Sequence, residues 1–109
     1  MKVQVETDHN VHGSEALNAH ATNMIERALQ HHGDQITRVE VHLTDENSSA
    51  KSGMRDKRCV IEARPAGLPP VAAHHTADTV DAALAGATEK LQRVLERSLG
   101  RLHDKRSGA

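Results

Sequence analysis

The residues of this chain with the clearest capacity for chemistry are five cations near its C-terminal end. They follow one another at intervals of three or four residues, and they are Lys90, Arg93, Arg97, Arg101 and Lys105. At about 100° of turn per residue, a helix places them within one arc of about 120° and along a ridge about 20 Å long. Ammonium and guanidinium groups in such a row can contact successive phosphates of a nucleic acid. An ordinary solvated helix face is the alternative interpretation of the same pattern.

The charge of the chain is unevenly distributed, although the formal net charge is only −1. Residues 1–50 carry a net charge of −5 and residues 65–89 one of −3, whereas residues 51–64 carry +3 and residues 90–109 carry +4. A chain with this bipolar distribution can bind a polyanion in spite of its small total charge.

The polar connection over residues 45–56 offers a second candidate contact with a polyanion. Its cations are Lys51 and Arg55, and Lys57 follows at its end. Polar loops of this kind are usually only solvated. The C-terminal row is therefore the stronger candidate.

The nine histidines could serve as metal ligands or as a sensor of acidity. Zinc requires three or four converging ligands, whereas adjacent histidines of a strand, such as His74 and His75, point to opposite faces. We therefore expect no metal site and no cofactor. Imidazoles titrate at a pH of about 6.5, so protonation of nine histidines would move the formal charge from −1 to +8 and strengthen binding to RNA in acid.

Composition excludes several classes of function. The chain has no Phe, Tyr or Trp, so it cannot be a module that stacks unpaired bases on aromatic rings. It has no nucleophile elbow, P-loop or pair of carboxylates at catalytic spacing, and we expect no enzymatic activity. Cys59 is the only cysteine, which excludes an internal disulfide, and we interpret it as a small buried hydrophobe.

The chain has no apolar run of the roughly 20 residues that cross a bilayer, and it does not begin like a signal peptide. We expect a cytoplasmic monomer with no membrane partner. Its length predicts one domain over residues 1–103, followed by a short tail over residues 104–109.

Hydrophobic periodicity predicts the elements that must position the cations. Alternation of apolar and polar residues indicates four strands, at residues 2–7, 36–44, 58–64 and 71–73. Apolar residues at helical spacing indicate two helices, one over residues 14–32 with Ser14 as its N-cap and one that begins at Asp78. The second helix has an apolar seam that consists of Val80, Leu84, Ala87, Leu91, Val94, Leu95 and Leu102.

The predicted order is β-α-β-β-β-α, which is an α+β fold. A helix between the first two strands makes them parallel neighbours, and the short connections that follow make an antiparallel meander. Each strand has one apolar face, so both helices must pack on the same face of a four-stranded sheet. On the open face, we expect Arg38, Glu40, Arg58 and Glu62 to form cross-strand pairs.

Three segments of the chain resemble a known family. They are residues 56–65 (DKRCVIEARP), residues 76–84 (TADTVDAAL) and, above all, residues 89–97 (EKLQRVLER). They are similar to the ribosome hibernation-promoting factor and ribosome-associated inhibitor A family. The likeness covers the chain from its first strand to about Leu102, in the same order of elements. This order contains the α-β-β-β-α arrangement of double-stranded RNA-binding domains, which read RNA by shape and phosphate.

The resemblance implies a factor that lodges in the mRNA and tRNA channel of the small ribosomal subunit and keeps ribosomes inactive in stationary phase or stress. Its cations would contact ribosomal RNA: Lys90, Arg93 and Arg97 match the basic pattern of the last helix, and Arg27 matches one position of the first. The chain resembles the short form, which lacks a C-terminal dimerisation domain, so we do not expect it to pair ribosomes.

Two positions depart from the family pattern. Asn18 and Met24 stand where cations are common in the family. Together with the acidic first half of the chain, this departure leaves open an alternative function, a protein-binding regulatory module that has lost tight affinity for ribosomal RNA.

Overall fold

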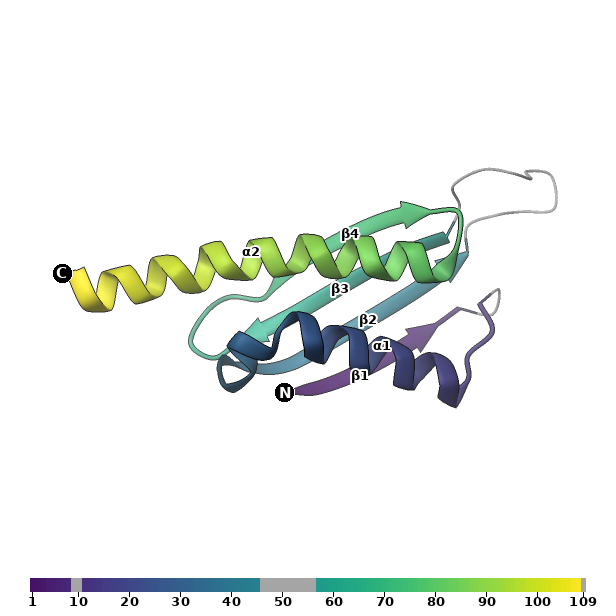
Figure 1. Ribbon diagram of the computed structural model, residues 1–109, viewed down its shortest axis with the longest axis horizontal. Helices are drawn as coiled ribbons and strands as arrows, with labels where there is room; N and C mark the ends of the chain where they lie inside the picture. The colour runs from purple at the N-terminus through teal and green to yellow at the C-terminus, as the bar shows by residue number, and fades with distance from the viewer. Residues whose placement is uncertain (9–10, 46–56, 109) are drawn as a thin grey trace.

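A computed structural model of the chain describes residues 1–8, 11–45 and 57–108, with side chains up to residue 100. Four strands and two long helices make up the fold (Figure 1). In chain order the elements are β1 (Lys2–Thr7), α1 (Glu15–Ala28), the 3₁₀-helix η1 (Gln30–Gln35), β2 (Ile36–Asp45), β3 (Lys57–Pro65), β4 (Val71–Ala77) and α2 (Val80–Gly108). This order confirms the predicted β-α-β-β-β-α fold. Helix α2 is continuous across residue 103, and the division between domain and tail stays a prediction.

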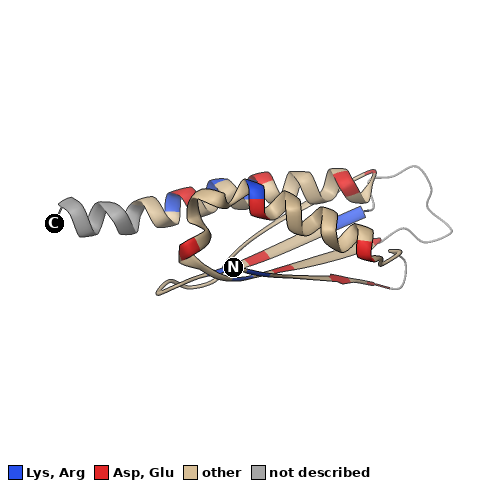
Figure 2. Cartoon of the chain, turned by 60° about the horizontal axis from the view of Figure 1, so that its bottom comes forward, with Lys and Arg blue, Asp and Glu red and all other residues tan. Residues whose placement is uncertain are grey.

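The strands form one sheet in the order β1-β2-β3-β4. β1 lies parallel to β2, and the other neighbours are antiparallel, so that Val39 lies opposite Val3 on one side and Ala63 on the other. Both helices cover the same face of the sheet, and the other face is open (Figures 1 and 2). The predicted topology is confirmed, and it leaves β1 and β4 as edge strands.

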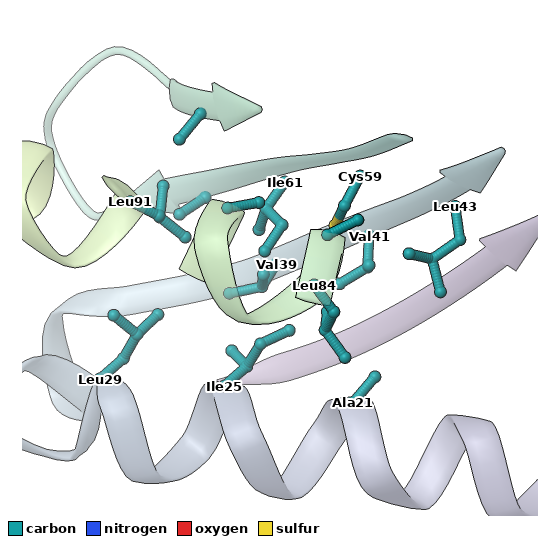
Figure 3. Close-up of a cluster of buried hydrophobic side chains, with 14 of the residues drawn as sticks. Ala21, Ile25, Leu29, Val39, Val41, Leu43, Cys59, Ile61, Leu84 and Leu91 are labelled. Atoms are coloured by element: carbon teal, nitrogen blue, oxygen red, sulfur yellow. The ribbon is translucent and has the colours of Figure 1, made fainter. Parts of the chain in front are cut away.

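The core lies between the sheet and the two helices and is built entirely from aliphatic side chains and Cys59 (Figure 3). Ile25 of α1, Val41 and Ile61 of the sheet and Leu84 of α2 are fully buried. Close packing of aliphatic groups replaces the larger aromatic side chains of most cores. Cys59 is buried as predicted, and its burial raises the pKa of the thiol to about 12.

Helix α1 begins as predicted but ends earlier than the predicted residue 32. Ser14 caps it by accepting a hydrogen bond from the Leu17 backbone N–H at 3.0 Å. Leu29 then leaves the helical conformation, with φ −108° and ψ 14°, while its side chain stays fully buried. The η1 turn that follows lets the chain reverse before β2, which a further turn of α-helix would prevent.

Helix α2 begins later than the predicted Asp78. The side chain of Thr79 accepts a hydrogen bond from the Ala82 backbone N–H at 3.0 Å, and this places the N-cap at Thr79. The predicted seam is correct at Leu84, Ala87, Leu91 and Leu95, which are buried.

Two other positions of α2 differ from the predicted seam. Val94 is only half-buried, because it lies at the border of the packed face. Leu99 is buried, four residues beyond Leu95, and continues the seam. The side chain of Leu102 lies outside the described residues.

The open face of the sheet carries paired charges, and the ion pairs of Arg38 and Glu62 differ from the predicted cross-strand pattern. Arg38 pairs with Glu40, and Arg64 with Glu62, each two residues apart on one strand. Contacts between strands are also present: Nδ1 of His42 in β2 lies 3.2 Å from Glu6 of β1, and Arg38 donates a hydrogen bond to Gln4 of β1. Side chains two residues apart share a face of a strand, and long arginines can reach along it as well as across. No helix in the described part of the chain is long and apolar enough to span a membrane.

Candidate nucleic-acid interface

A groove runs between the flank of α2 and the edge strand β4. Helix α2 packs its apolar seam on β3 and β4, so the next residues around its circumference lie beside the edge of the sheet. Lys90, Arg93 and Arg97 line the groove from α2 together with Val94. Residues 72–74 of β4 form the opposite wall, and the groove has a volume of about 350 Å³. The topology thus places three of the predicted cations along one concave surface.

The three cations of the groove differ in what they contact. Lys90 Nζ donates a hydrogen bond to the backbone carbonyl of His74 at 3.3 Å. Arg93 pairs with Glu89 one turn away, and both side chains are 64% exposed. For Arg97, no carboxylate lies within ion-pair distance among the residues that the structure describes.

These contacts leave the cations able to bind an external anion. Ion pairs as exposed as Arg93–Glu89 contribute about 0–1 kcal/mol, so a phosphate can displace the carboxylate. Acidic residues also occur along α2 (Figure 2), but none of the described residues that line the groove is acidic. The charge of the groove is therefore positive even though the chain as a whole is slightly negative.

The other predicted contact residues do not lie in this groove. Arg27 lies on α1, where it lines a separate hollow of about 480 Å³ with His20, Asn23, Met24 and Ala28. Lys57 begins β3 and forms an ion pair with Asp45 at 3.4 Å. The structure therefore brings together one part of the predicted set and leaves these two residues at other places.

Three of the predicted residues cannot be placed by their side chains. Arg101 and Lys105 lie on α2, in the part of the helix whose side chains are outside the described set, and Arg55 lies outside the described residues altogether. Their role as contacts stays a prediction.

Two features of the site were missed by the sequence analysis. The first is the backbone of β4, which forms one wall of the groove; the position of β4 at the end of the meander was a signal that it would be an edge strand. The second is an ion pair between His20 of α1 and Asp81 of α2, which joins the two helices. These residues are 61 positions apart, and no local pattern predicts their contact.

The histidines do not form a metal centre within the described residues. No three His, Cys, Asp or Glu side chains there lie close enough together to hold a metal ion. His20 pairs instead with Asp81 of α2, and His42 lies between the carboxylates of Glu6 and Glu40.

The chain was compared with protein families, curated proteins and solved structures. A family model described as "Sigma 54 modulation protein / S30EA ribosomal protein" matches residues 4–103. A search of curated proteins gives no match.

Two solved structures share the fold. The N-terminal domain of Protein Y from Thermus thermophilus is 17% identical, with a TM-score of 0.70 and coverage of 89% of this chain and 98% of that one. A ribosomal subunit interface protein from Coxiella burnetii is 18% identical, with a TM-score of 0.72 and coverage of 92% and 99%. At this level of identity the two structures establish the fold alone.

Proposed function

Because this chain belongs to the sigma 54 modulation protein / S30EA ribosomal protein family, we propose that it binds the small ribosomal subunit in the mRNA and tRNA channel. There it keeps ribosomes inactive under stress or in stationary phase. It acts in the cytoplasm as a monomer, without a cofactor and without catalysis. The domain over residues 1–103 carries this activity.

The observation that carries the proposal is the cationic groove beside α2. Lys90, Arg93 and Arg97 line it, no described acidic residue does, and of the three only Arg93 is paired with a carboxylate of the described residues. Ribosomal RNA presents closely spaced phosphates, and each phosphate bound by Lys or Arg releases counterions. The proteins with the same fold, a Protein Y domain and a ribosomal subunit interface protein, support the same assignment.

The remaining predicted cations extend this contact. Arg101 and Lys105 continue the row along α2, and Arg27 adds a charge on α1. Lys57, the first residue of β3, and Arg55, two residues before it in the sequence, belong to a second contact. Since Lys57 is already paired with Asp45, we expect it to contribute less than the residues of the groove.

The test is co-sedimentation with purified small ribosomal subunits. Reversing two charges of the groove, in the double variant Arg93→Glu/Arg97→Glu, should weaken binding by about a hundredfold or more, because two phosphate contacts become repulsive. Circular dichroism should show an intact fold, since both side chains are exposed.

The matched control is the double variant Lys2→Glu/Arg64→Glu. It changes the net charge by the same amount, and both residues are exposed on strands away from the groove. It should sediment with small subunits like the unchanged protein. Undiminished sedimentation of the Arg93→Glu/Arg97→Glu variant would instead favour the alternative, a protein-binding regulatory module.

A further inference from the structure

The wall of the groove opposite α2 consists of the backbone of an edge strand. Among the described residues β4 pairs with β3 alone, and no described strand lies on the other side of its backbone. In an antiparallel strand the N–H and C=O of one residue point to the same side, and successive residues alternate. The His74 carbonyl accepts a hydrogen bond from Lys90 of α2, which lies beside the outer edge of β4. We therefore place the polar backbone groups of His74 on the outer side, within the groove.

This arrangement couples one carbonyl to one cation. The bond from Lys90 Nζ to the His74 oxygen is 3.3 Å long and exposed, which makes it weak and easily exchanged. If a phosphate binds Lys90, the ammonium group moves toward the negative oxygens, and the carbonyl loses its donor. A carbonyl that is covered by a ligand without a new donor lowers the affinity for that ligand. The preferred ligand therefore carries a hydrogen-bond donor next to its phosphate.

We propose that the groove binds one strand of RNA through its sugar–phosphate backbone, and that a ribose 2′-hydroxyl donates a hydrogen bond to the His74 carbonyl. This inference rests on the proposed function and goes beyond it, because it assigns to the groove a preference for RNA over DNA. The 2′-hydroxyl is both donor and acceptor and is the group by which a protein distinguishes the two nucleic acids.

The dimensions and lining of the groove support this ligand. Lys90 and Arg97 are seven residues apart, which corresponds to about 10 Å along the helix, so the cations can contact more than one phosphate of a single strand. The chain has no Phe, Tyr or Trp on which a base could stack, so we expect most of the affinity to come from contacts with the backbone of the nucleic acid.

An acidic peptide that adds a strand to β4 would meet the same charges but fits less well. Lys90 lies over the edge at His74, and a lysine over an edge strand is a common obstacle to strand addition. A nucleic acid strand needs only the exposed carbonyl and not the continuous ladder of hydrogen bonds that a peptide strand requires.

The test compares three oligonucleotides of one sequence at constant salt: RNA, DNA and 2′-fluoro RNA. The 2′-fluoro group cannot donate a hydrogen bond, but it keeps the sugar conformation of RNA. Fluorescence anisotropy with the full chain should show about tenfold tighter binding of RNA than of either analogue, the value of one hydrogen bond whose loss leaves a covered carbonyl. Equal affinity for all three oligonucleotides would overturn the inference.

Amide chemical shifts locate the contact. Titration with RNA should shift the backbone amides of residues 72–76 as well as those of α2 around Arg93, whereas DNA should shift the α2 amides with a much smaller effect on β4. If every oligonucleotide shifted only the amides of α2, the His74 carbonyl of β4 would not be a contact, and the inference would be overturned.

A matched pair of variants separates the charge from the hydroxyl contact. Arg97→Gln should weaken the binding of all three oligonucleotides by a similar factor and leave the RNA preference unchanged, while Arg64→Gln, on the open face, should alter neither. Loss of the RNA preference in Arg97→Gln would contradict the assignment to the His74 carbonyl. So would displacement of the RNA by an acidic peptide that shifts the amides of β4.

The two proposals can fail separately. Equal binding of RNA and DNA, with sedimentation on small subunits retained, would remove the 2′-hydroxyl contact and leave the proposed function standing. Absence of sedimentation with subunits, with the RNA preference intact, would remove the ribosomal function alone.

Discussion

The side chain of His75 occupies the space that a side chain at position 86 would need. A Cβ at Gly86 of α2 would lie 2.2 Å from Cδ2 of His75 and 2.4 Å from its Cγ. The imidazole ring of β4 therefore lies directly against the helix backbone. This close approach sets the distance between α2 and β4, the two elements that form the groove.

We expect Gly86→Ala to destabilise the protein by about 1–3 kcal/mol, because the ring must move or the helix must shift. In a His75→Ala background, Gly86→Ala should instead stabilise the protein, because alanine exceeds glycine in helix propensity by up to about 1 kcal/mol. Urea unfolding followed by circular dichroism measures both. Stabilisation by Gly86→Ala in both backgrounds would show that the ring does not constrain the helix.

Burial of the Cys59 thiol predicts a loss of stability in alkali. Because its pKa rises to about 12 in the folded protein from a value of 9.0, the unfolded chain loses this proton first as the pH rises. The free energy of unfolding should be unaffected by this group below pH 9 and should fall by about 1 kcal/mol per pH unit between pH 9 and 12.

The measurement compares how the free energy of unfolding depends on pH in the unchanged protein and in Cys59→Ala. The variant is less stable but has no thiol at position 59. The two proteins share every other ionisable group, and the chain has no tyrosine. An identical alkaline slope in the two proteins would show that the thiol ionises normally in the folded state.

At the scale of the elements, the prediction and the structure differ at the start of α2. Asp78 has a residue type that favours an N-cap, but the side chain of Thr79 makes the capping hydrogen bond, to the Ala82 N–H. Thr79→Ala should therefore cost about 1 kcal/mol of stability, whereas Asp78→Ala should have an effect within about 0.5 kcal/mol. Thermal unfolding of the two variants decides between the two residues, and a larger loss of stability for Asp78→Ala would show that Asp78 is the cap.

The elements themselves were predictable because each has a distinct period. Val39, Val41 and Leu43 alternate with polar residues, and Leu84, Leu91 and Leu95 recur at helical spacing, so their burial followed from the pattern. The details at the ends were not predictable, because they depend on the packing of other elements. At the end of α1, for example, Leu29 leaves the helical conformation while its side chain is buried in the core.

The candidate site was predictable only in part, for the same reason. Helical spacing placed Lys90, Arg93 and Arg97 on one flank of α2, and the structure shows them in one groove. The spacing of residues along one helix cannot indicate which element forms the opposite wall of the groove. The wall formed by His74 and its neighbours depends on the strand order, and the pairing of Lys57 with Asp45 depends on the register of β2 and β3.

At the scale of the whole molecule, the distribution of charge predicts how binding responds to salt. The three cations of the groove should contribute about −2 to −3 to the slope of a plot of log affinity for small subunits against log salt concentration, and the other proposed contacts should make the slope steeper. Arg97→Gln should make the slope shallower by about 1, and Arg64→Gln should not change it. Affinity independent of salt would favour an apolar contact with a protein partner.

Both helices pack on one face of the sheet, and this arrangement has a consequence for the degradation of the protein in the cell. Helix α2 closes the core through Leu84, Leu91 and Leu95, and the same helix holds the cations of the groove. A nucleic acid seated there would hold the helix on the sheet and raise the melting temperature through mass action. Proteases that cleave transiently opened chains would then spare the bound copies and remove the free ones, so the amount of protein in the cell would follow the number of sites available to it.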